Sequence, residues 1–292
     1  MPRCTRLLCT FIAALALSAC SPLKLVLANS FASFGHYTRF ANLAYGGQSA
    51  NRLDLYRPLH SGHDPVVVFF YGGGWNSGDK ADFRFVGAAL AKAGFLAIVP
   101  NYRRYPEAMF PAFMQDAAQA VAWTRAHAQE WGGDPEHIFV VGHSAGAHIA
   151  VLLALDEHYL QEVGGTTRWL RGVVGLSGPY DFLPFREAYL NKLFGPPENF
   201  PRSQPINYVR ADAPPLLLMH GVQDARVQVE NTRSLTKAMR AAGGSVTTVY
   251  FDGAGHADLV AAFSNVKRQR LPVLQNIEAF VRSRDSGTGG AQ

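Results

Sequence analysis

"HIFVVGHSAGAHIAVLLAL", residues 137–155, joins the two apolar patterns that decide the fold class. Residues 138–141 form a short β-branched and aromatic run that is typical of a buried strand, and residues 145–155 form an apolar stretch of helical length. From about Leu53 onward, short apolar runs and helix-like stretches alternate in the same way. This alternation predicts an α/β fold, in which helices cover both faces of a mostly parallel central sheet.

The expected strands lie at residues 52–56, 66–71, 95–100, 137–142, 172–178, 214–221 and 246–251. The expected helices cover residues 81–93, 110–131, 145–155, 229–242 and 266–283. No repeat or long linker interrupts this order, so residues 51–284 are predicted to form one domain, with 20–50 as a lead-in and 285–292 as a disordered tail. Residues 180–212, rich in proline and aromatic residues, are interpreted either as a short lid-like insertion or as a connection that packs on the core.

The N-terminal residues have the layout of an export signal, with basic residues, a short apolar stretch and then small residues. Residues 17–20, LSAC, resemble the lipobox of bacterial lipoproteins. This predicts a signal peptide over residues 1–19 and a lipid on Cys20, which would anchor an exported protein to a membrane, in the periplasm or at the outer membrane. The alternative is a soluble secreted or periplasmic protein that is cleaved elsewhere, for example after Ala28.

Composition excludes several classes of protein. With 48% hydrophobic and 17% charged residues the chain is globular, and its net charge of +5 is spread without a basic block, which argues against nucleic-acid binding. All three cysteines lie in the first 20 residues, so the folded domain has no disulfide or thiolate site. The histidines lack the spacing of metal ligands, and no metal site is expected. Nothing in the sequence indicates an oligomeric state.

The junction between the expected strand and helix reads G-x-S-x-G, with Gly142, Ser144 and Gly146 at the fixed positions. In this pattern the strand turns sharply into the helix and holds the serine hydroxyl at the top of the sheet. The glycines permit a close backbone approach that larger side chains would block. Ser144 is therefore predicted to be a nucleophile, and the alternative is that it only caps the helix.

A serine hydroxyl needs a base, and in this architecture the chain order is serine, acid, histidine. Among the histidines after Ser144, His256 has this order and lies in a glycine-rich loop after the last expected strand, whereas His220 is interpreted as a brace for its turn. Asp224 follows the penultimate strand and is predicted to orient the imidazole of His256. Asp181, after the preceding strand, is the alternative acid, or else a helix N-cap.

Three glycines, residues 72–74, follow the strand "VVVFFY". Acyl transfer through a serine builds negative charge on the substrate carbonyl oxygen, and backbone N–H groups must face that oxygen. One such donor is the N–H of Ala145, and the other is expected from the loop "YGGGW". The alternative is a phosphate-binding turn, but the chain has neither G-x-G-x-x-G nor P-loop spacing at this point.

Over residues 51–282 the chain resembles the α/β-hydrolase esterases, in particular the carboxylesterase branch related to hormone-sensitive lipase, feruloyl-esterase-like proteins and kynurenine formamidases. The motifs that carry the resemblance occur in the family's order: "DLYRP", "YGGGWNSGDK", "NYRRYPEAMFPAFMQD", "DPEHIFVVGHSAGAH", "SGPYDF", "HGVQDARV" and "GAGHAD". The resemblance implies an α/β-hydrolase fold that needs no cofactor.

Residue by residue, the resemblance implies a catalytic triad and three oxyanion donors, namely Ser144, Asp224 and His256, and the N–H groups of Gly73, Gly74 and Ala145. The family often has histidine at the position of Tyr71, so this chain departs from its relatives at the residue before the three glycines.

The expected activity is a serine carboxylesterase that acts on a small-molecule ester. An arylformamidase on the same machinery is one alternative, and a non-catalytic surface-binding lipoprotein is another. The acyl chain and the alcohol of the substrate depend on the shape of the pocket, which the sequence does not specify.

Overall fold

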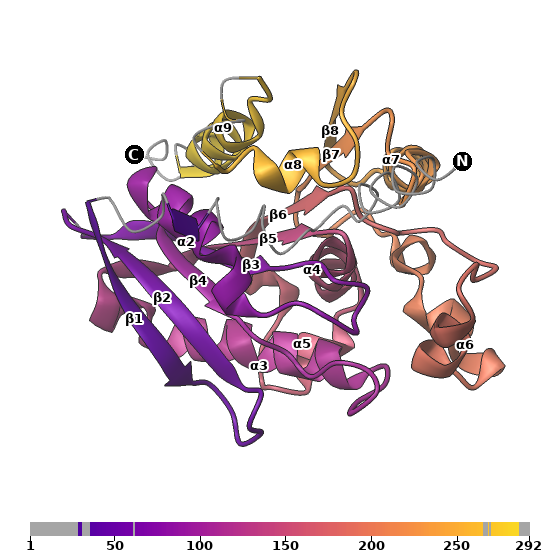
Figure 1. The fold of residues 1–292 in the computed structure, drawn as a ribbon, viewed down its shortest axis with the longest axis horizontal. Helices are drawn as coiled ribbons and strands as arrows, with labels where there is room; N and C mark the ends of the chain where they lie inside the picture. The colour runs from indigo at the N-terminus through magenta and orange to yellow at the C-terminus, as the bar shows by residue number, and fades with distance from the viewer. Residues whose placement is uncertain (1–28, 31–35, 61, 265–267, 269, 286–292) are drawn as a thin grey trace, which may run out of the picture.

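A computed structural model describes residues 29–30, 36–60, 62–264, 268 and 270–285. These residues form a sheet with the strand order β1-β2-β4-β3-β5-β6-β7-β8 (Figure 1). The strands are β1 (Tyr37–Ala44), β2 (Arg52–Pro58), β3 (Asp64–Phe70), β4 (Leu96–Pro100), β5 (Gly133–His143), β6 (Leu170–Leu176), β7 (Leu216–Gly221) and β8 (Val246–Phe251). The export signal, Cys20 and the tail after residue 285 lie outside the described residues, so export and lipidation stay predictions.

The sheet is parallel from β4 through β8, whereas β1 pairs with β2, and β2 with β4, in the antiparallel direction. Strands β3, β4 and β6 and the second half of β5 are almost wholly buried, because their β-branched and aromatic residues face helices on both sides. This confirms the predicted α/β fold and all seven expected strands.

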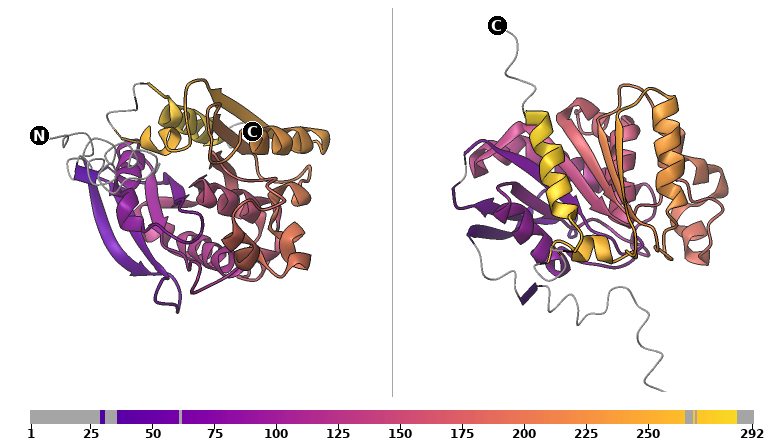
Figure 2. Two further views of the ribbon diagram at one scale, coloured as in Figure 1. Left: turned by 45° about the vertical axis from the view of Figure 1, so that its right-hand side comes forward. Right: turned by 90° about the horizontal axis from the view of Figure 1, so that it is seen from above.

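Helices cover both faces of the sheet (Figures 1 and 2). Helix α4 (Ala145–Leu155) packs against β5 and β6 and against α3 (Ala112–His127), whereas α9 (Val273–Asp285) packs against β6 and β7. In Figure 1, α9 lies above the sheet and α3 and α4 lie below it. The remaining helices are α2 (Arg84–Lys92), α5 (His158–Gln161), α6 (Ala188–Phe194), α7 (Glu230–Ala241) and α8 (Asp258–Ala261), with 3-10 turns at Lys80–Phe83, Ala128–Trp131, Thr167–Trp169, Pro197–Ser203 and Pro205–Tyr208.

Two boundaries differ from the sequence-based expectation. The interpretation of residues 20–50 as a lead-in is wrong for β1, which pairs with β2 at the edge of the sheet. This strand is only partly buried, and its register shifts between Phe40 and Leu43, so it lacks the apolar alternation that marks a strand. The helix expected from residue 266 is described from Val273, which directly follows Pro272.

The segment of residues 180–212, here called the insertion, connects β6 to β7 and contains α6. Leu193 and Phe194 are buried in the core, whereas Phe185 and Tyr189 pack on it while partly exposed. The insertion therefore packs on the core and also forms part of the wall of a pocket that is described below.

Candidate active site

Four loops meet at the carboxyl edge of the parallel strands, as the strand directions require. Ser144 directly follows β5, and the three glycines follow β3. Asp224 lies three residues after β7, and His256 lies five residues after β8. Residues that are far apart in the sequence are thus brought to one place by the sheet.

Ser144 occupies a strained turn between β5 and α4, with φ +56° and ψ −121°. The positions on either side, Gly142 and Gly146, have no room for a side chain. A Cβ on Gly142 would stand 2.1 Å from the carbonyl oxygen of Gly146, and a Cβ on Gly146 would stand 2.0 Å from that of Phe70. Helix α4 can approach β3 and β5 closely only because both residues lack a side chain.

We therefore expect Gly146→Ala to lower the free energy of unfolding by about 3 kcal/mol, because the added methyl group meets backbone that cannot move aside cheaply. Urea unfolding measures this change. Gly47→Ala is the matched control, since a Cβ there meets no heavy atom within 4 Å. Equal stability of the two variants would show that the turn does not need a glycine at residue 146.

The side chains of Ser144, His256 and Asp224 form a continuous chain of hydrogen bonds. The Ser144 Oγ lies 2.8 Å from the His256 Nε2, and the His256 Nδ1 lies 2.8 Å from the Asp224 Oδ2. Since a carboxylate can only accept, Nδ1 carries the proton and Nε2 accepts from the serine hydroxyl. The structure thus brings together the three residues that the sequence nominates, in the tautomer that general-base catalysis needs.

The carboxylate of Asp224 is buried and held on both oxygens. Its Oδ1 accepts the backbone N–H groups of Arg226 at 3.0 Å and Val227 at 2.9 Å, and its Oδ2 also lies 3.3 Å from the Nε2 of His220. Burial opposes the charge, but the hydrogen bonds from His220, His256 and Val227 outweigh it and hold the pKa of Asp224 well below its usual range. The carboxylate is therefore ionised at neutral pH.

The other histidines that follow Ser144 in the sequence, and the alternative acid Asp181, occupy different sites. His220 is buried, and its Nε2 lies 2.9 Å from the carbonyl oxygen of Val227, as expected for a residue that braces this turn. His148 contacts the carbonyl oxygen of Ser203 at 2.7 Å, and His158 contacts Asp156. Asp181 is exposed, and its backbone N–H donates to Asn231.

His143 also belongs to the site. It occupies the unspecified position between Gly142 and Ser144 in G-x-S-x-G, so the motif did not point to it. It is buried, and its Nε2 donates to the backbone carbonyl oxygen of His256 at 3.0 Å. Burial, together with the nearby His256, lowers the pKa of His143 to about 3 from an ordinary value of 6.5. The neutral ring therefore fixes the loop that carries His256.

The buried His143 makes stability depend on pH. Below pH 6.5 the unfolded chain binds a proton at this residue that the folded chain refuses until about pH 3, so the free energy of unfolding falls as the pH drops through this window. From pH 7 to pH 4 the loss for this residue is about 3 kcal/mol. We expect urea unfolding of His143→Gln to show a correspondingly smaller loss. Exposed His60→Gln is the control, and equal acid sensitivity of wild type and His143→Gln would contradict the assignment.

Residues 72–74, here called the glycine loop, lie beside the turn that carries Ser144. A Cβ on Gly72 would stand 2.9 Å from the Ser144 Cβ, so the loop approaches the serine as closely as a glycine permits. Gly73 and Gly74 have φ values of +135° and +60°, which favour glycine. Gly74 and Ala145 line the same pocket as Ser144, whereas Gly73 accepts from the Ser77 hydroxyl and does not contribute to the lining.

Tyr71 holds the start of this loop where the family often has histidine. Its hydroxyl donates to the Oδ1 of Asn101 at 2.9 Å, and its backbone carbonyl accepts from the hydroxyl of Tyr102 at 2.8 Å. Its ring stacks between Phe83 and Tyr102, with centroid distances of 5.3 and 4.8 Å. Stacking and two hydrogen bonds fix the glycine loop without a histidine.

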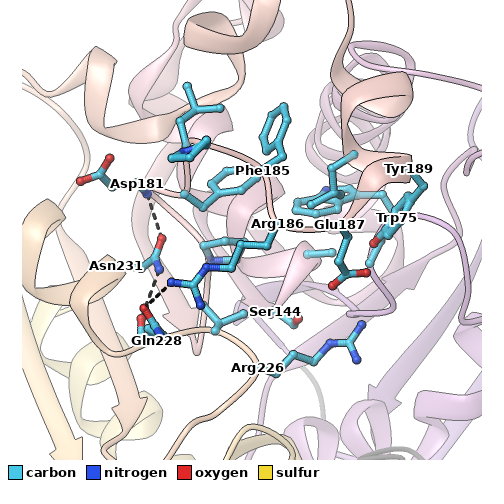
Figure 3. Close-up of a pocket in the computed structure, with 18 of the residues that line it drawn as sticks. Trp75, Ser144, Asp181, Phe185, Arg186, Glu187, Tyr189, Arg226, Gln228 and Asn231 are labelled. Atoms are coloured by element: carbon cyan, nitrogen blue, oxygen red, sulfur yellow. Dashed lines mark hydrogen bonds between the residues drawn. The ribbon is translucent and has the colours of Figure 1, made fainter.

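Ser144 opens into a pocket of about 390 Å³ (Figure 3). The insertion supplies Phe182 and Phe185 to its wall, and Trp75, which directly follows the glycine loop, adds a further aromatic surface. Tyr189 of α6 donates its hydroxyl to the carbonyl oxygen of Gly74 at 3.2 Å, which ties the insertion to the glycine loop. The pocket is thus shaped mainly by the segment with the least regular secondary structure.

Within the described ranges, no group of three or more histidine, cysteine, aspartate or glutamate side chains is arranged to hold a metal ion. In the same part of the chain, no helix combines the length and the apolar character needed to cross a membrane.

The sequence was compared with models of known protein families. The family model described as BD-FAE matches residues 53–239, which include Ser144, the glycine loop and Asp224. The chain belongs to the BD-FAE family. His256 lies beyond the matched residues, so its assignment rests on its position in this structure.

Relatives of this BD-FAE chain include proteins named as esterases. The chain is 30% identical to the isoprenylcysteine alpha-carbonyl methylesterase of Arabidopsis thaliana, over 75% of this chain and 56% of that protein. It is 33% identical to the esterase LipC of Mycobacterium tuberculosis, over 75% of this chain and 60% of that protein. The aligned part of the chain therefore spans little more than half the length of these relatives.

Solved structures establish the fold of this BD-FAE chain as an α/β-hydrolase fold. Esterase Est2 of Thermogutta terrifontis is 25% identical, with a TM-score of 0.69, and the match covers 88% of this chain and 95% of the other. Esterase B of Lactobacillus rhamnosis is 22% identical, with a TM-score of 0.76 and coverage of 91% and 95%, and supports the fold alone.

Proposed function

We propose that the protein is a serine carboxylesterase, which cleaves carboxylic esters through an acyl-enzyme on Ser144. The observation that carries this proposal is the pair of 2.8 Å hydrogen bonds that links Ser144 through His256 to Asp224. The names of the relatives, which include a methylesterase and an esterase, add support for an ester bond as the target.

In the first half of the reaction, the Ser144 Oγ attacks the ester carbonyl carbon while His256 Nε2 takes the hydroxyl proton. The imidazolium that forms is stabilised by the carboxylate of Asp224. The tetrahedral intermediate then collapses, and His256 returns the proton to the leaving alcohol. In the second half, His256 activates a water that attacks the acyl-enzyme, which releases the acid and restores Ser144.

The negative charge on the carbonyl oxygen needs backbone donors, and we assign this role to Ala145 and the glycine loop. Ala145 is the first residue of α4, so its N–H has no partner within the helix and lies at the positive end of the helix dipole. Gly74 shares the pocket with Ser144. Gly73 is the further candidate from the sequence, but it is not among the residues that line the pocket.

The two alternative functions, an arylformamidase and a non-catalytic binding protein, have less support than the carboxylesterase. Neither relative reported above is named as a formamidase, so the arylformamidase is not put forward as a second function. A non-catalytic binding protein would have no need for a serine held at the correct distance from a histidine and an aspartate.

A fluorophosphonate probe tests the proposal directly, because such probes react with activated serines. We expect the full-length protein to be labelled on Ser144, as located by peptide mass spectrometry, and to hydrolyse nitrophenyl esters of short acids. Boiled protein is the control for non-specific labelling. A folded protein that neither takes up the label nor hydrolyses any of these esters would rule out the proposed function.

A further inference from the structure

Several charged side chains line the same pocket as Ser144, and the catalytic steps above use none of them. Arg186, Glu187 and Arg226 all line the pocket together with Ser144. In Figure 3, Arg226 extends from below Ser144 toward the side on which Glu187 and Tyr189 lie. All three are exposed, and Arg226 is the one whose backbone contacts Asp224.

Arg226 lies two residues after Asp224, and its backbone N–H donates to the Asp224 Oδ1 at 3.0 Å. Its backbone is therefore fixed by the same carboxylate that orients His256. Its Nη2 reaches the glycine loop and lies 3.9 Å from the point where a Cβ of Gly74 would stand. The exposed guanidinium thus extends from the loop of Asp224 to the loop to which we assign the oxyanion donors.

The positive charge of Arg226 is not neutralised by an ion pair. In the described part of the chain, its side chain forms no hydrogen bond and no ion pair. By contrast, Arg39 pairs with Asp54 at 2.7 Å and Arg103 pairs with Asp116 at 2.9 Å. Arg186 also has no ion pair among the described residues, but its guanidinium donates to the neutral Gln228 Oε1 at 3.0 Å. The guanidinium of Arg226 is therefore available to a ligand.

The nearby acids limit how much negative charge a ligand can carry. Glu230 is paired with Arg233 at 2.8 Å, and Asp181 lies on the opposite side of the pocket in Figure 3. Glu187 remains, and both it and Arg226 act electrostatically on the hydroxyl of Tyr189. Because Glu187 lies on the same side of the pocket as Arg226 (Figure 3), this side suits a ligand with a single negative charge better than a dianion. The planar fork of arginine matches a carboxylate.

We propose that Arg226 binds a free carboxylate of the substrate, so that the enzyme acts on esters that carry a second, unesterified acid group. This inference rests on the proposed esterase function and narrows its substrate class. The carboxylate lies on the acyl side or on the alcohol side of the scissile bond, and the two arms of the experiment below separate these cases.

Two pairs of esters of matched shape test the proposal. For the acyl side, monoethyl glutarate is compared with ethyl 5-methylhexanoate, in which an isopropyl group replaces the carboxylate. For the alcohol side, 3-acetoxypropanoate is compared with 3-methylbutyl acetate. Release of ethanol or acetate gives kcat/KM for each, and the quantity compared is the ratio of kcat/KM for the acid-bearing ester to that for its neutral partner.

Arg226→Gln is expected to lower this ratio about ten-fold in at least one pair, which corresponds to about 1.4 kcal/mol of lost discrimination. Glu187→Gln is expected to raise the ratio in the same pair, because it removes the competing negative charge. Arg240→Gln, an equal change of charge on the exposed face of α7, is the control and is expected to leave the ratio unchanged. Added salt is expected to lower the ratio in the wild type but not in Arg226→Gln.

An unchanged ratio for Arg226→Gln in both pairs would overturn the proposal, and so would an equal fall in Arg240→Gln. Either result, with the neutral esters still hydrolysed, would leave the esterase function intact. Failure of the esterase function has a different signature, namely no hydrolysis of any of the four esters that depends on Ser144.

Discussion

Replacing Ser144 with alanine is expected to lower kcat for ester hydrolysis by at least about 10⁴-fold, since it removes the only atom placed to attack the substrate from beside His256. The turn itself accepts the change, because alanine at φ +56° is no more strained than serine. The lost hydrogen bond costs about 1 kcal/mol of stability, which leaves the fold intact. Steady-state kinetics on a nitrophenyl ester, with circular dichroism to check folding, measures the effect.

Ser234→Ala, on the outer helix α7, is the matched control for this substitution and is expected to retain wild-type turnover. Residual activity in Ser144→Ala should reflect only the backbone donors and substrate binding. Turnover within a few-fold of wild type would eliminate the acyl-enzyme mechanism.

Asp224→Asn is expected to lower kcat about 10⁴-fold through the tautomer of His256. The side-chain carbonyl oxygen of the asparagine must face the N–H groups of Arg226 and Val227, which donate to the Asp224 Oδ1 in the wild type. Its NH2 group then points at His256 Nδ1, which has to give up its proton in order to accept. The proton moves to Nε2, and the ring can no longer accept from Ser144.

The control for Asp224→Asn is Asp181→Asn, which alters the alternative acid of the sequence analysis. Asp181 is exposed, so its replacement is expected to change kcat only a few-fold. The pH–rate profile and kcat of both variants are compared with wild type. A larger loss in Asp181→Asn than in Asp224→Asn would move the acid to residue 181.

Much of the fold is predictable because buried parallel strands need uninterrupted apolar runs. The run at residues 66–71 corresponds to β3 to within two residues, and residues 145–155 are helical as expected. The order of Ser144, Asp224 and His256 is also informative, since each residue follows a strand whose carboxyl end lies at the same edge of the sheet. Their convergence follows from the topology.

What the sequence does not reveal depends on contacts between residues that are distant along the chain. Strand β1 is half-exposed at an edge, so its residues carry little apolar pattern. His143 contacts a backbone carbonyl 113 residues away, and Tyr189 contacts one 115 residues away. Any residue type offers a backbone carbonyl, so the residue that accepts such a hydrogen bond cannot be recognised from its side chain. The roles of His143 and Tyr189 therefore become clear only when the arrangement of the strands is known.

The hydroxyl of Tyr189 has a consequence for how such enzymes diversify. The insertion forms the pocket wall, and an enzyme could change its substrate range by exchanging this segment while keeping the sheet. Because Tyr189 also holds the carbonyl of Gly74, an exchanged segment that lacks a hydroxyl at this point would loosen the glycine loop as it reshaped the pocket. Substrate range and turnover are therefore linked through one side chain, and a functional chimera has to carry over that tyrosine or replace its hydrogen bond.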